Sequence, residues 1–343
     1  MSTPVDGAIQ LTSSTSSPAS RGPWVTAMRR IISDPSAYIP IVVLAALLLA
    51  SLAAPLFAAY VSRSDPLTSS LTAKISLDGE EVKVIQPVTG GLGIGTVPIG
   101  PTWTGQYFVG ADSQGRDVMA RILYGGQNSL VIAGAATLIT LVFAAIIGLA
   151  AGFFGGVIDT VLSRFLDIIW AFPVFLLATS LSVVTIGREL SFGFFTLRAD
   201  SIIVPILIIG IVNVPYVARP VRGQTQQIAQ SDFVLAATGI GVPRWRILLM
   251  DIIPNVLSTL IVFAPMMMAL NMILESSLSY LNIGVQAPAA SWGTIIRDNK
   301  GLLYSRPLTT IAPGLAIVLT VLMLNLLGDV IRDTLDPKAK VKL

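Results

Sequence analysis

The sequence has no cysteine and no histidine among its 343 residues. The absence of cysteine excludes disulfide bonds and any metal site built on thiolates. The absence of histidine removes the commonest protein metal ligand and the side chain that most often acts as a general base near neutral pH. We therefore predict no metal site in this chain.

Charge is also scarce. Only 12% of the residues are charged, 53% are hydrophobic, and the mean hydropathy is +0.78. A soluble domain has about a quarter of its residues charged, so this composition indicates a surface that meets membrane lipids. The net charge of +3 is small and the basic residues are spread along the chain. We predict no nucleic-acid partner.

The phosphate-binding pattern G-x-x-x-x-G-K-[ST] does not occur in the sequence. That loop cradles nucleotide phosphates with its backbone amides, so we expect the chain not to bind and hydrolyse ATP by itself. The glycines at Gly90, Gly91, Gly93 and Gly95 have no helical pattern behind them, and they are interpreted as a loop. No catalytic residue and no cofactor is predicted.

Six long charge-free runs predict six membrane spans, since about 20 apolar residues cross a bilayer. The runs lie between Asp34 and Arg63, Arg121 and Asp159, Asp167 and Arg188, Asp200 and Arg219, Asp251 and Glu275, and Arg306 and Asp329. Two other charge-free stretches, 84–111 and 276–296, are interrupted by proline, glycine and polar residues. Irregular backbone is not tolerated against lipid, so the first is predicted as a loop and the second as a helix end with a loop or re-entrant segment.

Lysine and arginine are slightly more frequent on the cytoplasmic side if the N-terminus is cytoplasmic, which is the expected direction of this bias. The sequence therefore predicts a multi-pass membrane protein with both termini in the cytoplasm. The predicted segments are a disordered arm with a juxtamembrane segment (1–33), a first transmembrane helix (34–60), an extracytoplasmic loop (61–127), a five-helix core (128–332) and a tail (333–343).

The extracytoplasmic loop contains an alternating stretch at 74–85 with Asp78-Gly79 in its middle. Alternation around an Asp-Gly pair is typical of a β-hairpin. A small hairpin or cap is one interpretation of the loop, and an irregular insert is the other.

The segment 220–255 is predicted to be cytoplasmic, and its second half carries the most informative pattern. A short helical stretch ends in the small pair Ala236 and Ala237, which would let a partner's backbone approach closely. Gly241 permits a sharp turn because it tolerates positive φ, and Pro254 marks the start of span five. From this pattern alone an ordinary intracellular loop is favoured over an element that docks into another protein.

The same segment resembles the EAA loop of ABC importer permeases, in which an E-A-A triplet is followed by a glycine and then by a proline. Ala236, Ala237, Gly241, Pro254 and Asn255 match that loop. A leucine stands where the glutamate of the triplet usually lies. The resemblance implies contact with an ATPase, and the residues expected to make it are Leu235, Ala236, Ala237, Gly241, Arg244, Pro254 and Asn255.

Other segments extend the resemblance in the same order along the chain. The segments 110–125, 152–159, 279–286 and 325–329 are similar to stretches of the C-type permeases of dipeptide, oligopeptide and nickel importers. The loop from 61 to 107 is longer than that subfamily leads us to expect.

This resemblance implies an all-α polytopic protein of the bacterial plasma (inner) membrane with the type I ABC importer permease fold, namely one peripheral N-terminal helix and a five-helix core. It implies four protein partners, which are a homologous second permease, two ABC ATPase subunits and an extracytoplasmic substrate-binding protein. Dipeptides or oligopeptides are the expected substrates. Nickel or another small solute remains an alternative, because the binding protein selects the substrate.

Three polar residues are candidates for the translocation path or its gate: Glu275, Asn282 and Asn325. A carboxylate within a span is a functional candidate by default, but an interfacial position suits Glu275 equally well. Arg164 and Asp167 are interpreted as a pair near the membrane face. A secondary transporter and a membrane-anchored receptor are the rival classes, and co-purification of ATPases would exclude both.

Overall fold

The computed structural model describes residues 34–77, 79–88, 95–185, 190–192, 195–197 and 201–335. The predicted arm and juxtamembrane segment at 1–33 lie outside these residues. So do the glycines at 90, 91 and 93, and 336–343 of the predicted tail.

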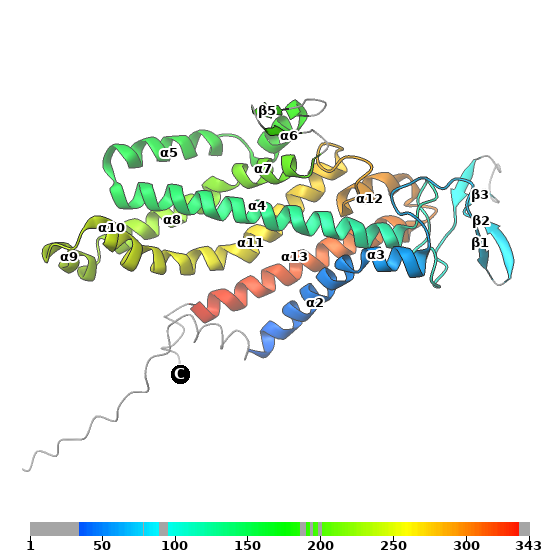
Figure 1. Cartoon of the computed structure of the whole chain (residues 1–343), viewed down its shortest axis with the longest axis horizontal. Coiled ribbons are helices and arrows are strands. Elements are labelled where there is room, and N and C mark those ends of the chain that lie inside the picture. Colours follow the sequence, from blue (N-terminus) through cyan, green and yellow to red (C-terminus); the bar gives the residue numbers. More distant parts are fainter. Residues whose placement is uncertain are drawn as a thin grey trace, which may run out of the picture.

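Helices make up most of the described chain (Figure 1). They are α2 (Pro35–Leu52), α3 (Ala54–Leu56), the π-helical turn η1 (Phe57–Ser62), α4 (Val118–Phe154), α5 (Gly156–Trp170), α6 (Val174–Thr185), α7 (Ile203–Val212), α8 (Val214–Ala229), α9 (Asp232–Gly239), α10 (Arg244–Ile247), the π-helical turn η2 (Leu248–Ile252), α11 (Ile253–Tyr280), α12 (Trp292–Asn299), the 3₁₀ turn η3 (Lys300–Leu302) and α13 (Pro307–Leu335).

Four helical stretches are long and apolar enough to cross a membrane: α2, α4, the continuous stretch Arg244–Tyr280, and α13. Two helix pairs reach the same length and apolar character only when their two helices are counted together. These are α5 with α6, which bends by 82° at its break, and α7 with α8, which bends by 42°. Counting each bent pair as one span gives the six predicted from the charge-free runs.

Two of the described helical stretches begin earlier in the sequence than the spans predicted there. The third span begins at Gly156, before the charge-free run, because α5 is amphipathic and carries its charges on one face. Pro254, which was predicted to mark the entry to span five, lies in the first turn of α11, and the continuous helical stretch that contains α11 already begins at Arg244. The π-helical turn η2 ends two residues before the proline, as one of the single π-helical turns that occur inside continuing α-helices.

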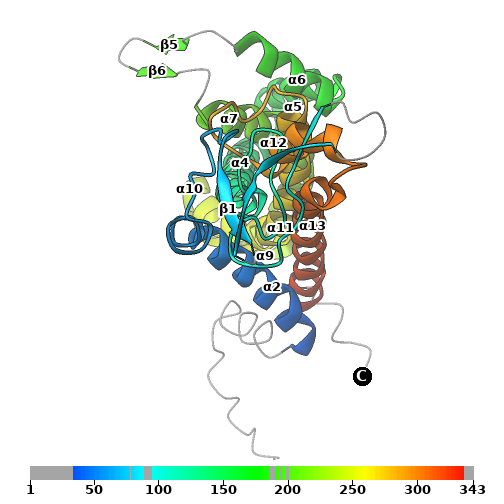
Figure 2. The same cartoon turned by 90° about the vertical axis from the view of Figure 1, so that its right-hand side faces the viewer.

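Helix α4 lies at the centre of the bundle when viewed from the hairpin end (Figure 2). Asp117 caps it, and the carboxylate accepts from the backbone amides of Met119 and Ala120 at 2.9 and 3.2 Å. Gly148 and Gly152 bring α8 close, because a Cβ at either position would lie within 3 Å of α8 backbone oxygens. Small residues at such contacts are how membrane helices pack tightly.

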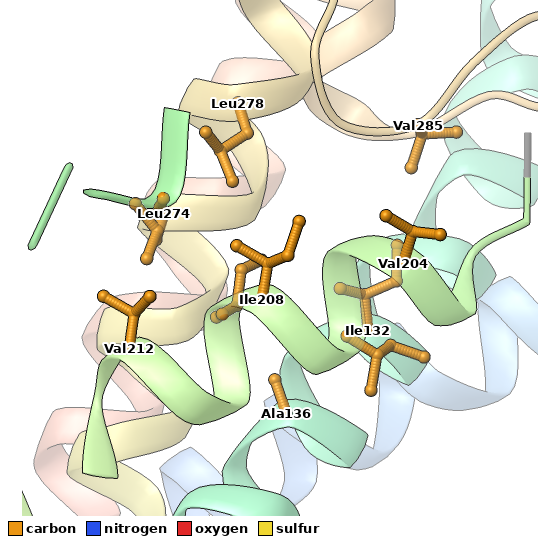
Figure 3. Packing of buried hydrophobic residues seen from close by; sticks show 11 residues of the cluster. Ile132, Ala136, Val204, Ile208, Val212, Leu274, Leu278 and Val285 are labelled. Atoms are coloured by element: carbon orange, nitrogen blue, oxygen red, sulfur yellow. The ribbon is translucent and has the colours of Figure 1, made fainter. Parts of the chain in front are cut away.

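One apolar cluster joins α4, α7 and α11, with Ile132 and Ala136 facing Val204 and Ile208 (Figure 3). Beside it, the Asn213 side chain in the break between α7 and α8 donates to the Asn271 amide oxygen over 2.8 Å. Asn271 donates in turn to Thr137 of α4 over 2.9 Å. These bonds satisfy buried polar groups at the bend.

The predicted hairpin is present. Strands β1 (Lys74–Leu77) and β2 (Glu80–Lys83) pair antiparallel, and Gly79 in their turn has φ +88°. A second pair, β3 (Ile85–Pro87) with β4 (Thr96–Pro98), replaces part of the predicted irregular loop. These strands and the following segment share a small apolar core of Ile75, Val84, Ile99, Tyr107 and Ala111. A third short pair joins β5 (Leu190–Phe192) to β6 (Phe195–Leu197).

The hairpins formed by β1–β4 and the segment α9–α10 lie at opposite ends of the bundle, and α2 lies at its edge beside α13 (Figure 1). The two sequence segments singled out for function are therefore separated by the full length of the helices.

Candidate functional site

The matched residues of the coupling segment form a capped turn. Helix α9 ends with the Gly241 amide donating to Thr238 and the Val242 amide donating to Ala237, each over 3.0 Å. Gly241 has φ +84°. This is the Schellman arrangement, in which a residue in the left-handed region closes the helix end. The positive φ is the conformation for which the sequence pattern called for glycine.

Two buried side chains fix this turn on the bundle, Val234 of α9 and Ile247 of α10. Between them lie large apolar side chains that are exposed. Ile240 is 83% exposed and Trp245 63%. The other large apolar side chains exposed on this segment are Phe233, Leu235, Leu249 and Met250. A projecting turn with so much apolar surface is typical of a protein interaction site.

The expected contact residues do not all face outward. Leu235 and Ala236 are exposed, as are Gly241, Arg244 and Asn255. Ala237 is only half-buried and packs against the apolar cluster beneath α9. A large side chain at Ala237 would therefore disturb this subunit as well as a docked partner. Ile240 and Trp245 were missed by the sequence reasoning, although an exposed tryptophan in a turn is a usable signal.

An open pocket of about 590 Å³ lies next to this turn, between α8, α11 and α13. Gln224, Asn255 and Thr259 contribute polar groups to its wall. Gln224 accepts a hydrogen bond from the Thr259 hydroxyl, and Asn255 donates to the Asp251 carbonyl over 2.6 Å. Asn255 thus belongs both to the matched loop and to the pocket.

Glu275 is fully buried within the subunit, at 1% exposure. Its carboxylate accepts from the hydroxyls of Ser279 and Ser276 at 2.8 and 3.2 Å. Ser279 also accepts from the Val285 amide, so the carboxylate supports the turn that follows α11. Its bonding partners are internal, and it does not line the pocket beside α9.

The other two path candidates are exposed. Asn282 has φ +65° and closes α11, with the Ile283 amide donating to Leu278. The Asn282 side chain accepts from Arg297 of α12. Asn325 lies on an exposed part of α13. The three candidates are therefore not brought together at one site.

A buried ion-pair network at the hairpin end was not foreseen from the sequence. Asp112 accepts from Arg116 at 2.7 Å and from Arg121 at 2.6 Å. Both arginines also reach Asp298 of α12, at 3.2 and 2.9 Å. The network ties the start of α4 to α12, which is far away in sequence.

Two pKa values report on this end of the molecule. Burial, together with the nearby Asp117 and Asp112 carboxylates, raises the pKa of Tyr107 to about 12. Burial also disfavours the charged form of Asp298, but its ion pairs with Arg121 and Arg297 outweigh that effect and hold its pKa below the usual range. Tyr107 stays neutral and donates to the Gly115 carbonyl over 3.1 Å.

Comparison with known proteins identifies the family. Residues 144–341 match the family described as binding-protein-dependent transport system inner membrane component. The chain belongs to this family. The match covers the capped turn at α9, the pocket beside it and α12, so these features belong to the permease core.

Curated relatives agree with this assignment. The permease is 36% identical to the dipeptide transport system permease protein DppC of Alkalihalophilus pseudofirmus over 68% of its own length and 73% of the relative. It is 37% identical to the oligopeptide transport system permease protein OppC of Haemophilus influenzae, over 69% and 72%. It is 36% identical to the glutathione transport system permease protein GsiD of Pectobacterium atrosepticum, over 68% and 73%. The resemblance seen in the sequence is confirmed.

The fold is similar to a chain of the MetNI methionine ABC transporter in an inward-facing conformation. The alignment covers 63% of this permease and 97% of that chain, with a TM-score of 0.50 and 15% sequence identity. A second crystal form of the same transporter gives the same TM-score. This likeness supports the type I importer permease fold that the resemblance implied.

Proposed function

We propose that this chain is the membrane-spanning subunit of an ATP-driven importer of short peptides. It forms the translocation path with a homologous second permease and has no catalytic activity of its own. Hydrolysis of ATP takes place in two ABC ATPase subunits, and an extracytoplasmic binding protein delivers the substrate.

The observation that carries this proposal is the capped turn of α9 and α10. It projects from one end of the bundle, exposes large apolar side chains, and is fixed on the core by two buried ones. Closure of an ATPase pair around ATP would carry α9 with it as a rigid body. Such a displacement shifts the membrane helices between inward-open and outward-open arrangements, as a two-state switch.

The proposed orientation puts α9 and both termini in the cytoplasm and the hairpins β1–β4 outside. Opposite ends of the bundle would then serve two different partners, the ATPases at α9 and the binding protein at the hairpin end. Membrane lipids would surround the apolar faces of the outer helices.

Short peptides are favoured as the substrate by the three relatives named above, whose systems carry dipeptides, oligopeptides and glutathione. All of these are short peptides with a free amino group and a free carboxylate. Nickel or another small solute is the alternative within the family. The described residues contain no cluster of acidic side chains that could hold a metal ion.

A secondary transporter is the rival in another class. Such a transporter couples through ionisable groups inside the membrane, and Glu275 is the candidate for that role in α11. Its carboxylate is instead occupied by serine hydroxyls of the same subunit, which favours a supporting role in the turn after α11.

The proposal is tested by purifying the tagged chain from membranes under mild detergent, with and without its ATPases. ATPase subunits and a second permease should co-purify, and ATP hydrolysis should appear in the complex and not in the separated chain. In proteoliposomes the complex should take up a radiolabelled dipeptide when ATP and loaded binding protein are on opposite sides. Uptake driven by an ion gradient in the absence of ATPases would overturn the proposal.

A further inference from the structure

Helix α5 has two different exposed faces. Leu166 is buried and packs on the bundle, whereas Phe165 and Ile168 are apolar and more than half exposed. The other exposed face of α5 carries charged side chains. On it, the side chains of Arg164 and Asp167 are 78% and 48% exposed. An amphipathic helix in a membrane protein turns its apolar face to lipid, so the charged face needs another environment.

The charged face continues onto α8. Arg219 donates from Nη2 to the Asp167 carboxylate over 2.8 Å. Its guanidinium carbon lies 4.7 Å from the centre of the Trp170 ring, within the range of a cation–π contact. Arg219 is itself 41% exposed. The pair is therefore neither enclosed in the bundle nor isolated from solvent.

Aromatic rings extend this site from α5 across α8 to α11. Trp170 stacks on Tyr216 with centroids 6.1 Å apart, and Tyr216 meets the edge of Phe263 at 6.4 Å. Trp170 and Tyr216 are about two-fifths exposed. Three helices thus present an arginine, a carboxylate and a row of rings side by side.

This face is unsuited to lipid. Charged side chains placed against hydrocarbon are costly, and they turn to the bundle interior or to a water-filled cavity. Asp167 lies eleven residues after the first residue of α5, which is about 17 Å along the helix axis. The pair thus lies far from the start of α5 and three residues before its last residue, Trp170, at the bend to α6. An exposed ion pair at this position within the combined span α5–α6 indicates that the face made by α5, α8 and α11 borders an aqueous path.

The Arg219–Asp167 ion pair leaves N–H donors of Arg219 available for another acceptor. Asp167 is shared between Arg219 and, at 3.6 Å, Arg164, so the site has one more positive than negative group. Arg219 has five N–H donors, and within the described part of the chain it bonds only to Asp167. Its neighbour Arg222 differs, because it binds Asp159 through both Nε and Nη2.

We propose that Arg219 binds the C-terminal carboxylate of a peptide in the translocation path. Asp167 and Trp170 hold the guanidinium in place, and Tyr216 and Phe263 contact the adjacent peptide side chain. This inference rests on the proposed function and names the substrate group that the path recognises. An arginine is suited to this task because its planar donors match a carboxylate in bidentate geometry.

The first test asks whether the face is aqueous. Cysteine is placed at Tyr216 or, as the control, at Ile168 on the apolar face of α5, in this otherwise cysteine-free chain. In the assembled transporter a charged water-soluble thiol reagent should modify the Tyr216→Cys variant and not the Ile168→Cys variant. Transported peptide should slow the first reaction. Equal labelling of both positions, or an unreactive Tyr216→Cys variant, would overturn the aqueous assignment.

The second test separates carboxylate recognition from a structural role. The complete transporter, with saturating loaded binding protein, is given a dipeptide and its C-terminal amide, and the two uptake rates are compared. The parent should prefer the free acid, and Arg219→Gln should lower the ratio of acid uptake to amide uptake by about tenfold or more. Arg219→Lys, which keeps the charge, should retain part of the preference.

Arg222→Gln is the matched control, one turn further along α8. It can lower both rates through loss of its pair with Asp159, but the acid-to-amide ratio should not change. The inference fails if Arg219→Gln keeps the parent ratio at equal membrane abundance, or if the parent shows no preference. Absence of any peptide uptake by the parent would instead refute the proposed function.

Discussion

The backbone amide of Val242 donates to the carbonyl of Ala237 over 3.0 Å, and this bond closes the end of α9. The closure requires the intervening Gly241 at φ +84°. The orientation of the proposed ATPase-contacting turn thus depends on one residue in the left-handed region.

Substitution of Gly241 should uncouple transport without unfolding the permease. No described atom lies within 4 Å of a Cβ built at this position, so the cost is backbone strain of about 1–2 kcal/mol for a non-glycine residue. We expect Gly241→Val to lower uptake per ATP hydrolysed by severalfold, and Gly241→Asn to be milder, because asparagine tolerates this conformation.

Gly239→Ala is the control for that change. Gly239 also has open space at its Cβ, and its φ is not positive. Uptake and hydrolysis are measured in proteoliposomes at equal permease content. A Gly241→Val variant with the parent ratio of uptake to hydrolysis would show that the turn geometry is not needed for coupling.

Exposed apolar residues of the turn should govern ATPase binding. Ile240→Asp places a charge at a position that is 83% exposed in the isolated subunit and would bury it in the proposed interface, where an unpaired charge is costly. We expect ATPases to be lost from the purified complex while the permease stays in the membrane. The measurement is the ATPase-to-permease ratio after affinity purification.

Two further variants serve as comparisons for Ile240→Asp. Leu235→Ala should be mild, since it removes part of one exposed side chain. Ala237→Arg should lower permease abundance as well as uptake, because Ala237 packs on the subunit's own core. If the Ile240→Asp variant binds ATPases as well as the parent does, this turn is not part of the ATPase interface.

Labelling should place the two ends of the bundle on opposite sides of the membrane. Gly79 and Ile240 are exposed and lie in turns at opposite ends. A cysteine at Gly79 should react with an impermeant maleimide in intact spheroplasts, and a cysteine at Ile240 only after the membrane is opened. The reverse pattern would invert the proposed topology.

Loss of the Asp298 carboxylate should destabilise the hairpin end of the permease. Asp298→Asn leaves Arg116 and Arg121 with one partner fewer in a buried site, which costs about 3 kcal/mol or more. The apparent Tm in detergent should fall clearly. Lys74→Ala, which breaks an exposed pair with Glu81, should leave it unchanged.

The effect of Asp298 should depend on pH in a defined direction. The folded-state pKa lies below the ordinary value, so the carboxylate's contribution is complete above about pH 4 and is lost as the pH falls through the folded pKa. The difference in Tm between parent and Asp298→Asn should therefore shrink in acid. A constant difference down to pH 2 would contradict the role of the charge.

Local signals in the sequence located much of this architecture. The Asp78-Gly79 pair predicted the first hairpin, and Gly241 predicted a sharp turn, which is found there with a positive φ. Each of these features depends on a few neighbouring residues with known conformational preferences. Charge-free runs located the spans for a similar reason, because lipid imposes the same requirement on every residue of a run.

Features that depend on distant residues were not predictable. Arg116 and Arg121 reach Asp298 only because α12 packs on α4, and no local sequence pattern indicates those ion pairs. Glu275 is a candidate for the path from sequence because a carboxylate in a span is unusual, but the serines that bind its carboxylate are visible only in three dimensions. The search for uncharged runs missed helix α5, because an amphipathic helix carries charged residues on one face.

Of the four long spanning helices, α4 alone has no internal proline, whereas α2, α11 and α13 contain Pro40, Pro265 and Pro313. Its 37 residues correspond to about 55 Å of continuous helix. A tilt of about 5° would displace one end relative to the other by about 5 Å over that length. The ion-pair network joins the hairpin end of this helix to α12, and Gly152 packs on α8 near its other end. A displacement of α9 would therefore be transmitted along α4 to the hairpin end, where we propose that the binding protein docks.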